Sequence, residues 1–272
     1  MSAANTAPVI SFEDVHLDLG EGDILRGITF EVAPRETKVL IGETGSGKTL
    51  TLKLAAGLLK PTRGHVRVLG RDLGAMSESE LLAFRRQIGF VFQEGALFDS
   101  MSVADNVAYR LQEEDVEQTE VDARVREVLR FVEMEDAIEL FPADLSGGMR
   151  RRVSIARALV SKPHVVLYDS PTAGLDPLTS QTIIMFILRL RDTEGVTSLL
   201  ATHRLQDAFG LANYRFDPAQ GRVTTVPDAQ PGAQNGQPTT NFLVLRDGNV
   251  YFEGGPRAVL DSGDAYLKQF LA

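Results

Sequence analysis

The sequence contains no cysteine among its 272 residues, which excludes disulfide bonds and cysteine-based zinc sites and gives no support to secretion. Long apolar runs are also missing. The longest, residues 183–188, is far shorter than the roughly 20 residues that span a bilayer. The N-terminus lacks the basic stretch and apolar run of a secretory signal. These absences predict a soluble, cytoplasmic chain.

Positive charge is scarce, because 37 acidic residues outnumber 28 basic ones and the formal net charge is −9. A chain of this charge is poorly suited to binding the phosphate backbone of nucleic acid, so we expect no nucleic-acid partner. Apolar residues make up 43% of the chain. Its length and composition are sufficient to bury the core of one large domain or two small ones.

Strand-like and helix-like patterns alternate along the chain. This alternation predicts an α/β protein with a largely parallel, three-layered core. Short strands are predicted between residues 9 and 41, and residues 227–241, rich in proline, glycine, glutamine and asparagine, are predicted to form a mobile loop flanked by small hairpins. The other predicted elements are helices at 48–59, 78–87, 103–140, from about 147, from about 178 and at 204–212, and buried strands at 164–169 and 197–202.

Residues 42–49, GETGSGKT, carry the first chemical signal. They fit the pattern G-x-x-x-x-G-K-S/T and lie between a predicted strand and a predicted helix, as a phosphate-binding loop requires. Glycines let backbone N–H groups turn toward phosphates, while Lys48 supplies a positive charge and Thr49 a hydroxyl for Mg²⁺. The predicted nucleotide-binding residues are Gly42, Glu43, Thr44, Gly45, Ser46, Gly47, Lys48 and Thr49.

Asp169 ends the predicted buried strand HVVLYD and is a candidate holder of Mg²⁺. Taken alone, an aspartate at a strand end is equally well interpreted as a turn or helix-cap residue. The phosphate loop elsewhere in the chain favours the metal role.

A second anion cradle is predicted within LSGGMRRRVSIARAL, residues 145–159. Ser146 and the backbone N–H groups of Gly147 and Gly148 stand there at the start of a helix. This stretch resembles the signature motif of ATP-binding-cassette (ABC) ATPases. The resemblance implies that two subunits pair head to tail, and that each signature closes over the ATP held by the other subunit.

Further positions match the same family in order along nearly the whole chain. Gln93 corresponds to the loop glutamine near Mg²⁺ and water, residues 173–176 to the loop of communication between subunits, and His203 to the switch histidine. An isolated histidine such as His203 is also compatible with an ordinary hydrogen-bonded role. The resemblance implies ATP and Mg²⁺ as cofactors, with Thr49, Gln93 and Asp169 at the metal and Gln93, Ser170 and His203 in catalysis.

The fold that the resemblance implies is a P-loop NTPase ABC cassette: a mixed or parallel sheet core, an antiparallel β edge and a helical subdomain. We expect the ATP-binding domain to span residues 7–254, with the helical subdomain at about 94–160 and a flexible insertion at about 227–241. Residues 255–272 are expected to form a helical tail.

Residues 92–107 and 148–159 resemble the ATPase subunits of Mla/Mce-type phospholipid transporters. That resemblance implies a second ATP-binding subunit, an integral membrane permease and an Mce-domain protein as partners, at the cytoplasmic face of the inner membrane. The alternative is that these residues are general to importer-like ABC proteins. The arginines at 150–152 are equally compatible with a solvated helix face.

The sequence departs from the family pattern at Leu19, Ser170 and Arg204. Leu19 stands where many relatives stack an aromatic ring on adenine, and Arg204 where an aspartate often follows the switch histidine. Ser170 replaces the glutamate that polarises the attacking water. A serine hydroxyl with no neighbouring base does not take a proton from water at neutral pH, so slow hydrolysis is expected.

Three functions are compatible with these features. The first is an ATP-hydrolysing subunit that drives a permease, with phospholipid as the expected substrate. The second is a nucleotide-gated scaffold that dimerises and barely hydrolyses ATP. The third, a soluble ABC ATPase acting on ribosomes or DNA, is disfavoured by the single cassette, the acidic charge and the lack of a long coiled-coil insert.

Overall fold

The computed structural model describes residues 7–20, 22–226 and 238–271, in which strands and helices alternate. The strands are β1 (Ile10–Asp18), β2 (Asp23–Val32), β3 (Glu36–Ile41), β4 (Arg63–Val68), β5 (Arg71–Asp72), β6 (Ile88–Val91), β7 (Val165–Asp169), β8 (Thr197–Thr202), β9 (Tyr214–Asp217), β10 (Arg222–Thr225), β11 (Thr239–Arg246) and β12 (Asn249–Gly254). The α-helices are α1 (Lys48–Ala55), α2 (Glu78–Arg85), α3 (Val103–Gln112), α4 (Gln118–Phe131), α5 (Gly147–Leu159), α6 (Pro177–Glu194), α7 (Leu205–Asn213), α8 (Pro256–Asp261) and α9 (Ala265–Leu271). Two short 3₁₀ turns, Glu135–Ala137 and Pro142–Asp144, precede α5.

The central sheet has six strands in the order β12-β11-β3-β8-β7-β6. Strands β11, β3, β8, β7 and β6 run parallel, and β12 pairs antiparallel at the edge. Every residue of β3, β7 and β8 is buried, as expected for parallel strands covered on both faces. The carboxyl ends of β3, β7 and β8 therefore lie side by side, and their following loops share one edge of the sheet.

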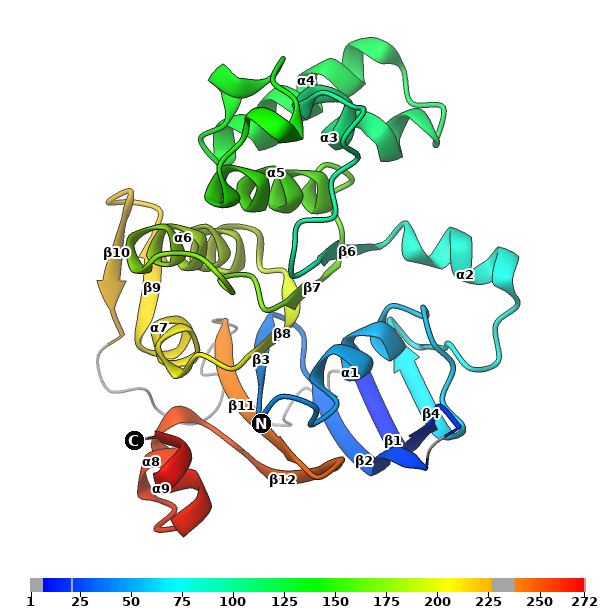
Figure 1. Cartoon of the computed structure of the whole chain (residues 1–272), viewed down its shortest axis with the longest axis vertical. Coiled ribbons are helices and arrows are strands. Elements are labelled where there is room, and N and C mark those ends of the chain that lie inside the picture. Colours follow the sequence, from blue (N-terminus) through cyan, green and yellow to red (C-terminus); the bar gives the residue numbers. More distant parts are fainter. Residues whose placement is uncertain (1–6, 21, 227–237, 272) are drawn as a thin grey trace, which may run out of the picture.

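Two hydrophobic cores flank the central sheet. On one side, α1 packs between this sheet and a four-stranded antiparallel sheet, β2-β1-β4-β5, where the rings of Phe12 and Phe30 stack 4.6 Å apart. On the other side lie α6 and α7, and α3, α4 and α5 form a separate helical layer above them (Figure 1). This arrangement confirms the expected α/β fold, with a largely parallel core sheet, an antiparallel β edge and a layer of helices.

An apolar face on α4 and a polar N-cap on α3 stabilise the helical layer. The apolar side chains on one face of α4 are all buried: Val121, Val125, Val128, Leu129 and the adjoining Val132. Ser102 caps α3 with its hydroxyl, which accepts a hydrogen bond from the Asp105 backbone N–H at 3.1 Å. Most charged residues of α4 are exposed, so its other face is a solvated surface.

The structure corrects several expected boundaries. The helix predicted at 48–59 ends at Ala55, because Gly57 adopts a left-handed φ of 63° and breaks the turn. The helical stretch predicted at 103–140 is divided between α3, α4 and a 3₁₀ turn, with Asp115 left-handed at a φ of 54° in the first break.

The loop predicted at 227–241 extends too far at its C-terminal end, because β11 begins at Thr239. Residues 227–237 lie outside the described residues, but Thr239–Asn241 begin β11 and pair in parallel with β3. Asn241 donates to Glu36 at 2.9 Å and Thr240 donates to the Leu211 carbonyl at 3.1 Å. The expected hairpin of β11 and β12 exists, but β11 also belongs to the central sheet, whereas β9 and β10 form a separate hairpin.

The C-terminal helices pack on this core through Val259 and Leu267, which are 3% and 2% exposed. In α9, the hydroxyl of Tyr266 donates to the Glu43 carboxylate at 3.4 Å. Among the residues that the structure describes, no helix combines the length and the apolar character required to cross a membrane.

Candidate functional site

The predicted phosphate loop joins β3 to α1 and packs closely against the protein behind it. A side chain at Gly42 would bring its Cβ within 2.3 Å of the Leu245 carbonyl, and one at Gly47 would meet Leu25 at 2.4 Å. Gly47 also has a φ of 100°, which disfavours other residues. The front of the loop is open, since a Cβ at Gly45 would meet nothing within 4 Å. The loop is thus packed closely at Gly42 and Gly47 and open at Gly45, where its backbone is accessible to a ligand.

Lys48 lies at the first turn of α1 with its ammonium folded over the loop. Its Nζ donates to the carbonyl oxygens of Gly42 at 2.8 Å and Glu43 at 2.7 Å, and lies 3.5 Å from the Ser46 hydroxyl. Partial burial lowers the pKa of Lys48, an effect opposed by Asp169 and Glu43. A bound phosphate would provide further charge compensation for this desolvated cation.

Thr49 and Asp169 meet at the carboxyl end of the sheet. The Thr49 hydroxyl donates to the Asp169 carboxylate at 3.1 Å. Asp169 is 6% exposed, and desolvation raises its pKa while the Thr49 hydrogen bond opposes the shift. A hydroxyl beside a partly desolvated carboxylate is a set of hard oxygen donors that fits Mg²⁺. Among the expected metal residues, the structure brings these two together directly.

The three residues expected to face the reacting phosphate come from three different loops. Gln93 follows β6, Ser170 follows β7 and His203 follows β8. Gln93 and His203 are exposed, whereas Ser170 is 8% exposed and has a left-handed φ of 46°. The backbone N–H of Ser170 donates to the Ala201 carbonyl at 2.9 Å, which fixes the start of its turn. Their roles in catalysis stay predictions.

The structure adds Arg151 to these residues. This residue is 5% exposed, and its guanidinium donates to the carbonyl oxygens of Phe92 at 2.7 Å and Ala173 at 3.4 Å. The solvated-face interpretation is therefore wrong for Arg151. Helical spacing was the available signal, because Arg151, Ile155 and Ala158 share the buried face of α5.

Arg204 and Asp207 form a second polar group that the sequence interpretation missed. Arg204 donates to the Thr172 carbonyl at 3.2 Å and to the Ser180 hydroxyl at 2.7 Å. Asp207, 3% exposed, accepts from the hydroxyls of Thr172 and Thr202, and burial raises its pKa. These contacts tie the loop after β8 to the loop after β7.

The signature residues begin α5 and contact the start of α6. Ser146 caps α5 by accepting from the Met149 N–H at 3.2 Å. A Cβ on Gly148 would meet the Thr179 methyl group at 2.5 Å, and one on Gly147 would lie 3.6 Å from Leu175. The glycines therefore allow the two helix starts to approach closely.

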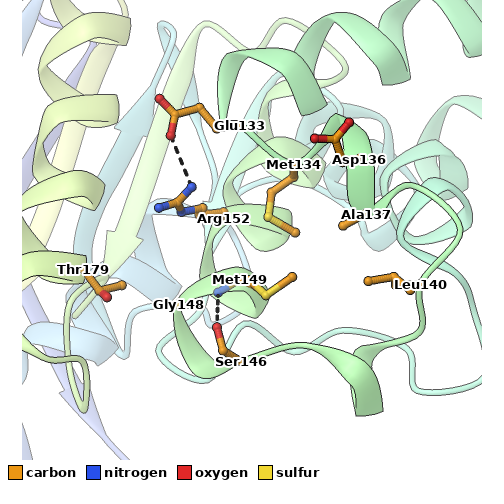
Figure 2. Close-up of a pocket in the computed structure, with 10 residues that line it drawn as sticks. All are labelled: Glu133, Met134, Asp136, Ala137, Leu140, Ser146, Gly148, Met149, Arg152 and Thr179. Atoms are coloured by element: carbon orange, nitrogen blue, oxygen red, sulfur yellow. Dashed lines mark hydrogen bonds and ion pairs between the residues drawn. The ribbon is translucent and has the colours of Figure 1, made fainter.

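A solvent-open cavity of about 380 Å³ adjoins the signature (Figure 2). The ion pair of Arg152 with Glu133, 3.3 Å long, lies on the opposite side from Leu140 in this view (Figure 2). Arg150 and Arg152 are half-buried, whereas Arg151 between them is buried. The lining residues are Glu133, Met134, Asp136, Ala137, Leu140, Ser146, Gly148, Met149, Arg152 and Thr179.

Leu19, at the position expected for base stacking, directly follows β1 and is 55% exposed. An aliphatic side chain offers area to a base but no π-face. Asp18 orders the following turn by accepting from the Gly20 N–H at 2.7 Å and the Gly22 N–H at 3.1 Å.

Comparison with known proteins identifies the family. The family model described as ABC transporter matches residues 25–173. The methionine import ATP-binding protein MetN of Brucella abortus is 37% identical over 202 residues, covering 74% of this chain and 55% of that protein. The chain thus spans about half the length of this relative. The intermembrane phospholipid transport system ATP-binding protein MlaF of Escherichia coli is 31% identical over 251 residues, covering 91% of this chain and 93% of that protein.

Solved structures show the same fold. The ATP-binding cassette MJ0796, a dimer in a post-hydrolysis state bound to ADP and Pi, aligns with a TM-score of 0.74 and 27% identity, covering 90% of this chain and 98% of that one. The cbiO1 protein of Clostridium perfringens, part of the transporter complex cbiONQ, aligns with a TM-score of 0.77 and 25% identity over 97% and 95% of the two chains. With a matching family model, relatives above 30% identity and this shared fold, the chain belongs to the ABC transporter family as an ATP-binding subunit.

Proposed function

We propose that this chain binds MgATP, pairs head to tail with a second ATP-binding subunit and drives an integral membrane permease. The observation that carries the proposal is the convergence of Lys48, Thr49 and Asp169 at one end of the phosphate loop. When bound there, Mg²⁺ supplies charge neutralisation for the terminal phosphates of ATP. The test is to purify the chain with its membrane partners, identify them, and measure MgATP-dependent pairing of the chain.

The substrate that we propose is phospholipid. The phospholipid-transport relative matches over nearly its whole length, whereas the methionine-import relative has higher identity over only about half of its own length. On this basis we also propose an Mce-domain protein as a partner and the cytoplasmic face of the inner membrane as the location. ATP-dependent movement of labelled phospholipid by the purified complex supports this assignment. Movement of methionine instead overturns it.

The permease would dock on an aromatic groove beside the Gln93 loop. The groove has a volume of about 320 Å³ and includes Phe90, Phe92, Phe98, Tyr109 and Arg157 in its lining. Phe90 and Phe92 stack 4.2 Å apart, and Phe98 contacts Tyr109 at 4.9 Å between ring centroids. Phe98 and Tyr109 are 42% and 37% exposed, so rings stand at the surface of a soluble domain. Such rings are typical anchors in protein interfaces.

Leu97→Asp combined with Phe98→Asp tests the groove. We expect co-purification of the permease to be lost, because Phe98 lines the groove and a charge at this position would be buried in the interface. Phe141→Asp, at an exposed ring outside the groove lining, is the control and should retain the permease. The melting temperature of each variant separates lost docking from lost folding. Retained docking in the folded double variant would contradict this placement.

The scaffold function remains the second candidate because of Ser170. A scaffold would bind MgATP and pair without turnover, whereas a transport ATPase releases phosphate continuously. Phosphate release in the presence of the membrane partner separates the two functions. Absence of release with retained ATP-dependent pairing would select the scaffold.

A further inference from the structure

Arg151 joins two loops that the proposed reaction needs. Phe92, whose carbonyl accepts one arm of the Arg151 guanidinium, immediately precedes Gln93. Ala173, whose carbonyl accepts the other arm, lies in the turn that begins at Ser170. The Ala173 N–H also donates to the Ser170 carbonyl at 3.0 Å. One planar side chain therefore connects the Gln93 loop to the Ser170 turn.

Arg204 connects the loop after β8, which contains His203, to the same turn. It immediately follows His203, and its guanidinium donates to the carbonyl of Thr172, the neighbour of Ala173. Asp207 holds the Thr172 hydroxyl and lies 3.9 Å from the Arg204 guanidinium. The two arginines thus hold adjacent carbonyls, in the dipeptide Thr172–Ala173.

We propose that Arg151 and Arg204 are positioning residues that align Gln93, Ser170 and His203 on one nucleotide through the dipeptide Thr172–Ala173. The inference rests on the proposed ATPase function and deepens it. Each of the three loops is connected to this dipeptide by a hydrogen bond from one of the two guanidinium groups or from the turn itself. Without a carboxylate at Ser170, alignment of water and phosphate is the remaining contribution of this turn.

The fork geometry explains the arginine at 151, whose two Nη atoms donate to two different carbonyls. Arg204 donates from one Nη atom to the Thr172 carbonyl and the Ser180 hydroxyl, while its Nε lies near Asp207. A guanidinium holds two acceptors in a fixed relation, whereas a lysine ammonium on a flexible stem has no such plane. Arg151→Lys and Arg204→Lys therefore keep the charge and remove the planar group that makes these contacts. Arg191→Lys is the matched control, because Arg191 is also 5% exposed and donates to the carbonyls of Leu211 at 2.6 Å and Tyr214 at 3.0 Å, outside the three loops.

The experiment measures steady-state turnover and ligand binding of the full chain, purified with the membrane proteins that accompany it. We expect Arg151→Lys and Arg204→Lys to lower kcat roughly 10- to 100-fold and to leave the KM for ATP within about twofold, because misplacement affects the reacting geometry and not the phosphate loop. The double variant should lose less than the product of the single losses, since both side chains hold one dipeptide. Arg191→Lys should lower the melting temperature without lowering kcat.

A second measurement does not depend on turnover. Aluminium fluoride with MgADP mimics the transferring phosphoryl group. We expect it to tighten MgADP binding to the wild type and to Arg191→Lys, but not to Arg151→Lys or Arg204→Lys, which are called the two loop variants below. If the wild type shows this tightening without turnover, and the loop variants lose it, the alignment stands and the hydrolysis proposal falls. Unchanged kcat and unchanged tightening in both loop variants would overturn the inference. A wild type without tightening would overturn it as well.

Discussion

The Thr49 hydroxyl and the Asp169 carboxylate lie 3.1 Å apart although 120 residues separate them in the chain. Thr49 lies in the first turn of α1, the helix after β3, and Asp169 ends β7, two strands away in the sheet. Parallel strands bring the two side chains to the same edge. This contact supports the proposed metal-binding role of a residue pair that no local sequence pattern connects.

Asp169→Asn should weaken the contribution of Mg²⁺ to ATP binding. The amide retains the shape and a hydrogen-bond acceptor for Thr49, but it lacks the negative charge that holds the metal shell. We expect roughly 10- to 100-fold weaker MgATP binding with little change in binding of ATP in the presence of a chelator. Calorimetry under both conditions measures the difference, with Asp122→Asn on α4 as the control. Equal losses with and without Mg²⁺ would argue against a metal role.

Lys48→Ala should weaken nucleotide binding itself. The glycine loop would remain, but the phosphates would lose the one cation that the loop already surrounds. Loss of a charged hydrogen bond corresponds to about 10- to 100-fold in affinity. Lys162→Ala, which removes a surface ion pair with Glu127, should bind normally. Unchanged affinity in the Lys48 variant would reject the phosphate-loop assignment.

The phosphate loop and the signature were predictable because their chemistry is contiguous in sequence. A glycine-rich loop between an apolar strand and a helix leaves its full pattern in residues 42–49. The contacts of Arg151, in contrast, could not be predicted from the sequence. Its burial follows from helical spacing, but its partners are the backbone carbonyls of Phe92 and Ala173, which are present in every residue and leave no trace in the sequence.

The start of β11 was missed for a different reason. Thr239–Asn241 have the polar composition of a loop, and their strand conformation comes from pairing with β3, about 200 residues earlier. Side chains of Thr240 and Asn241 bond to Leu211 and Glu36, so their polarity is satisfied inside the fold. Local composition predicts solvent exposure here, and long-range pairing overrides it.

Ser146→Arg should prevent ATP-driven pairing without affecting nucleotide binding by one subunit. A bulky cation would fill the cradle that is proposed to receive the γ-phosphate held by the partner. Ser146 also caps α5, and a lost cap costs about 1 kcal/mol. Ser146→Ala removes the cap without the bulk and should still pair. An ATP-dependent dimer of the arginine variant, seen by size-exclusion chromatography with light scattering, would count against head-to-tail pairing.

Leu267→Ala should destabilise the chain, because Leu267 of α9 is 2% exposed in the core. A buried leucine reduced to alanine typically costs 2–5 kcal/mol, so we expect about that loss in the free energy of unfolding. Leu260→Ala in α8 is the control, since this side chain is 56% exposed and should change stability by about 0.5 kcal/mol or less. Urea unfolding of the two variants measures the difference, and equal stabilities would show that α9 does not pack in solution.

Ser170→Glu should accelerate ATP hydrolysis. Lys48, Thr49 and Asp169 are available to hold MgATP, so binding and closure of the pair should persist in the wild type while the chemical step is slow. Serine can orient a water molecule, but it supplies no base, and general-base catalysis is typically worth 10²–10⁴-fold. Ser170 already has a left-handed φ of 46°, so exchange for another non-glycine residue does not introduce a new kind of backbone strain.

Ser170→Gln separates the base from the bulk of the glutamate. The amide has nearly the same size and hydrogen-bonding reach but does not accept a proton from water at neutral pH. We expect phosphate release, measured with the membrane partner present, to rise about 10-fold or more in Ser170→Glu and to stay near the wild-type rate in Ser170→Gln. Equal rates in both variants would attribute any change to shape. A wild type as fast as Ser170→Glu would mean that another group takes the proton, and that the chain is a transport ATPase with a relocated base.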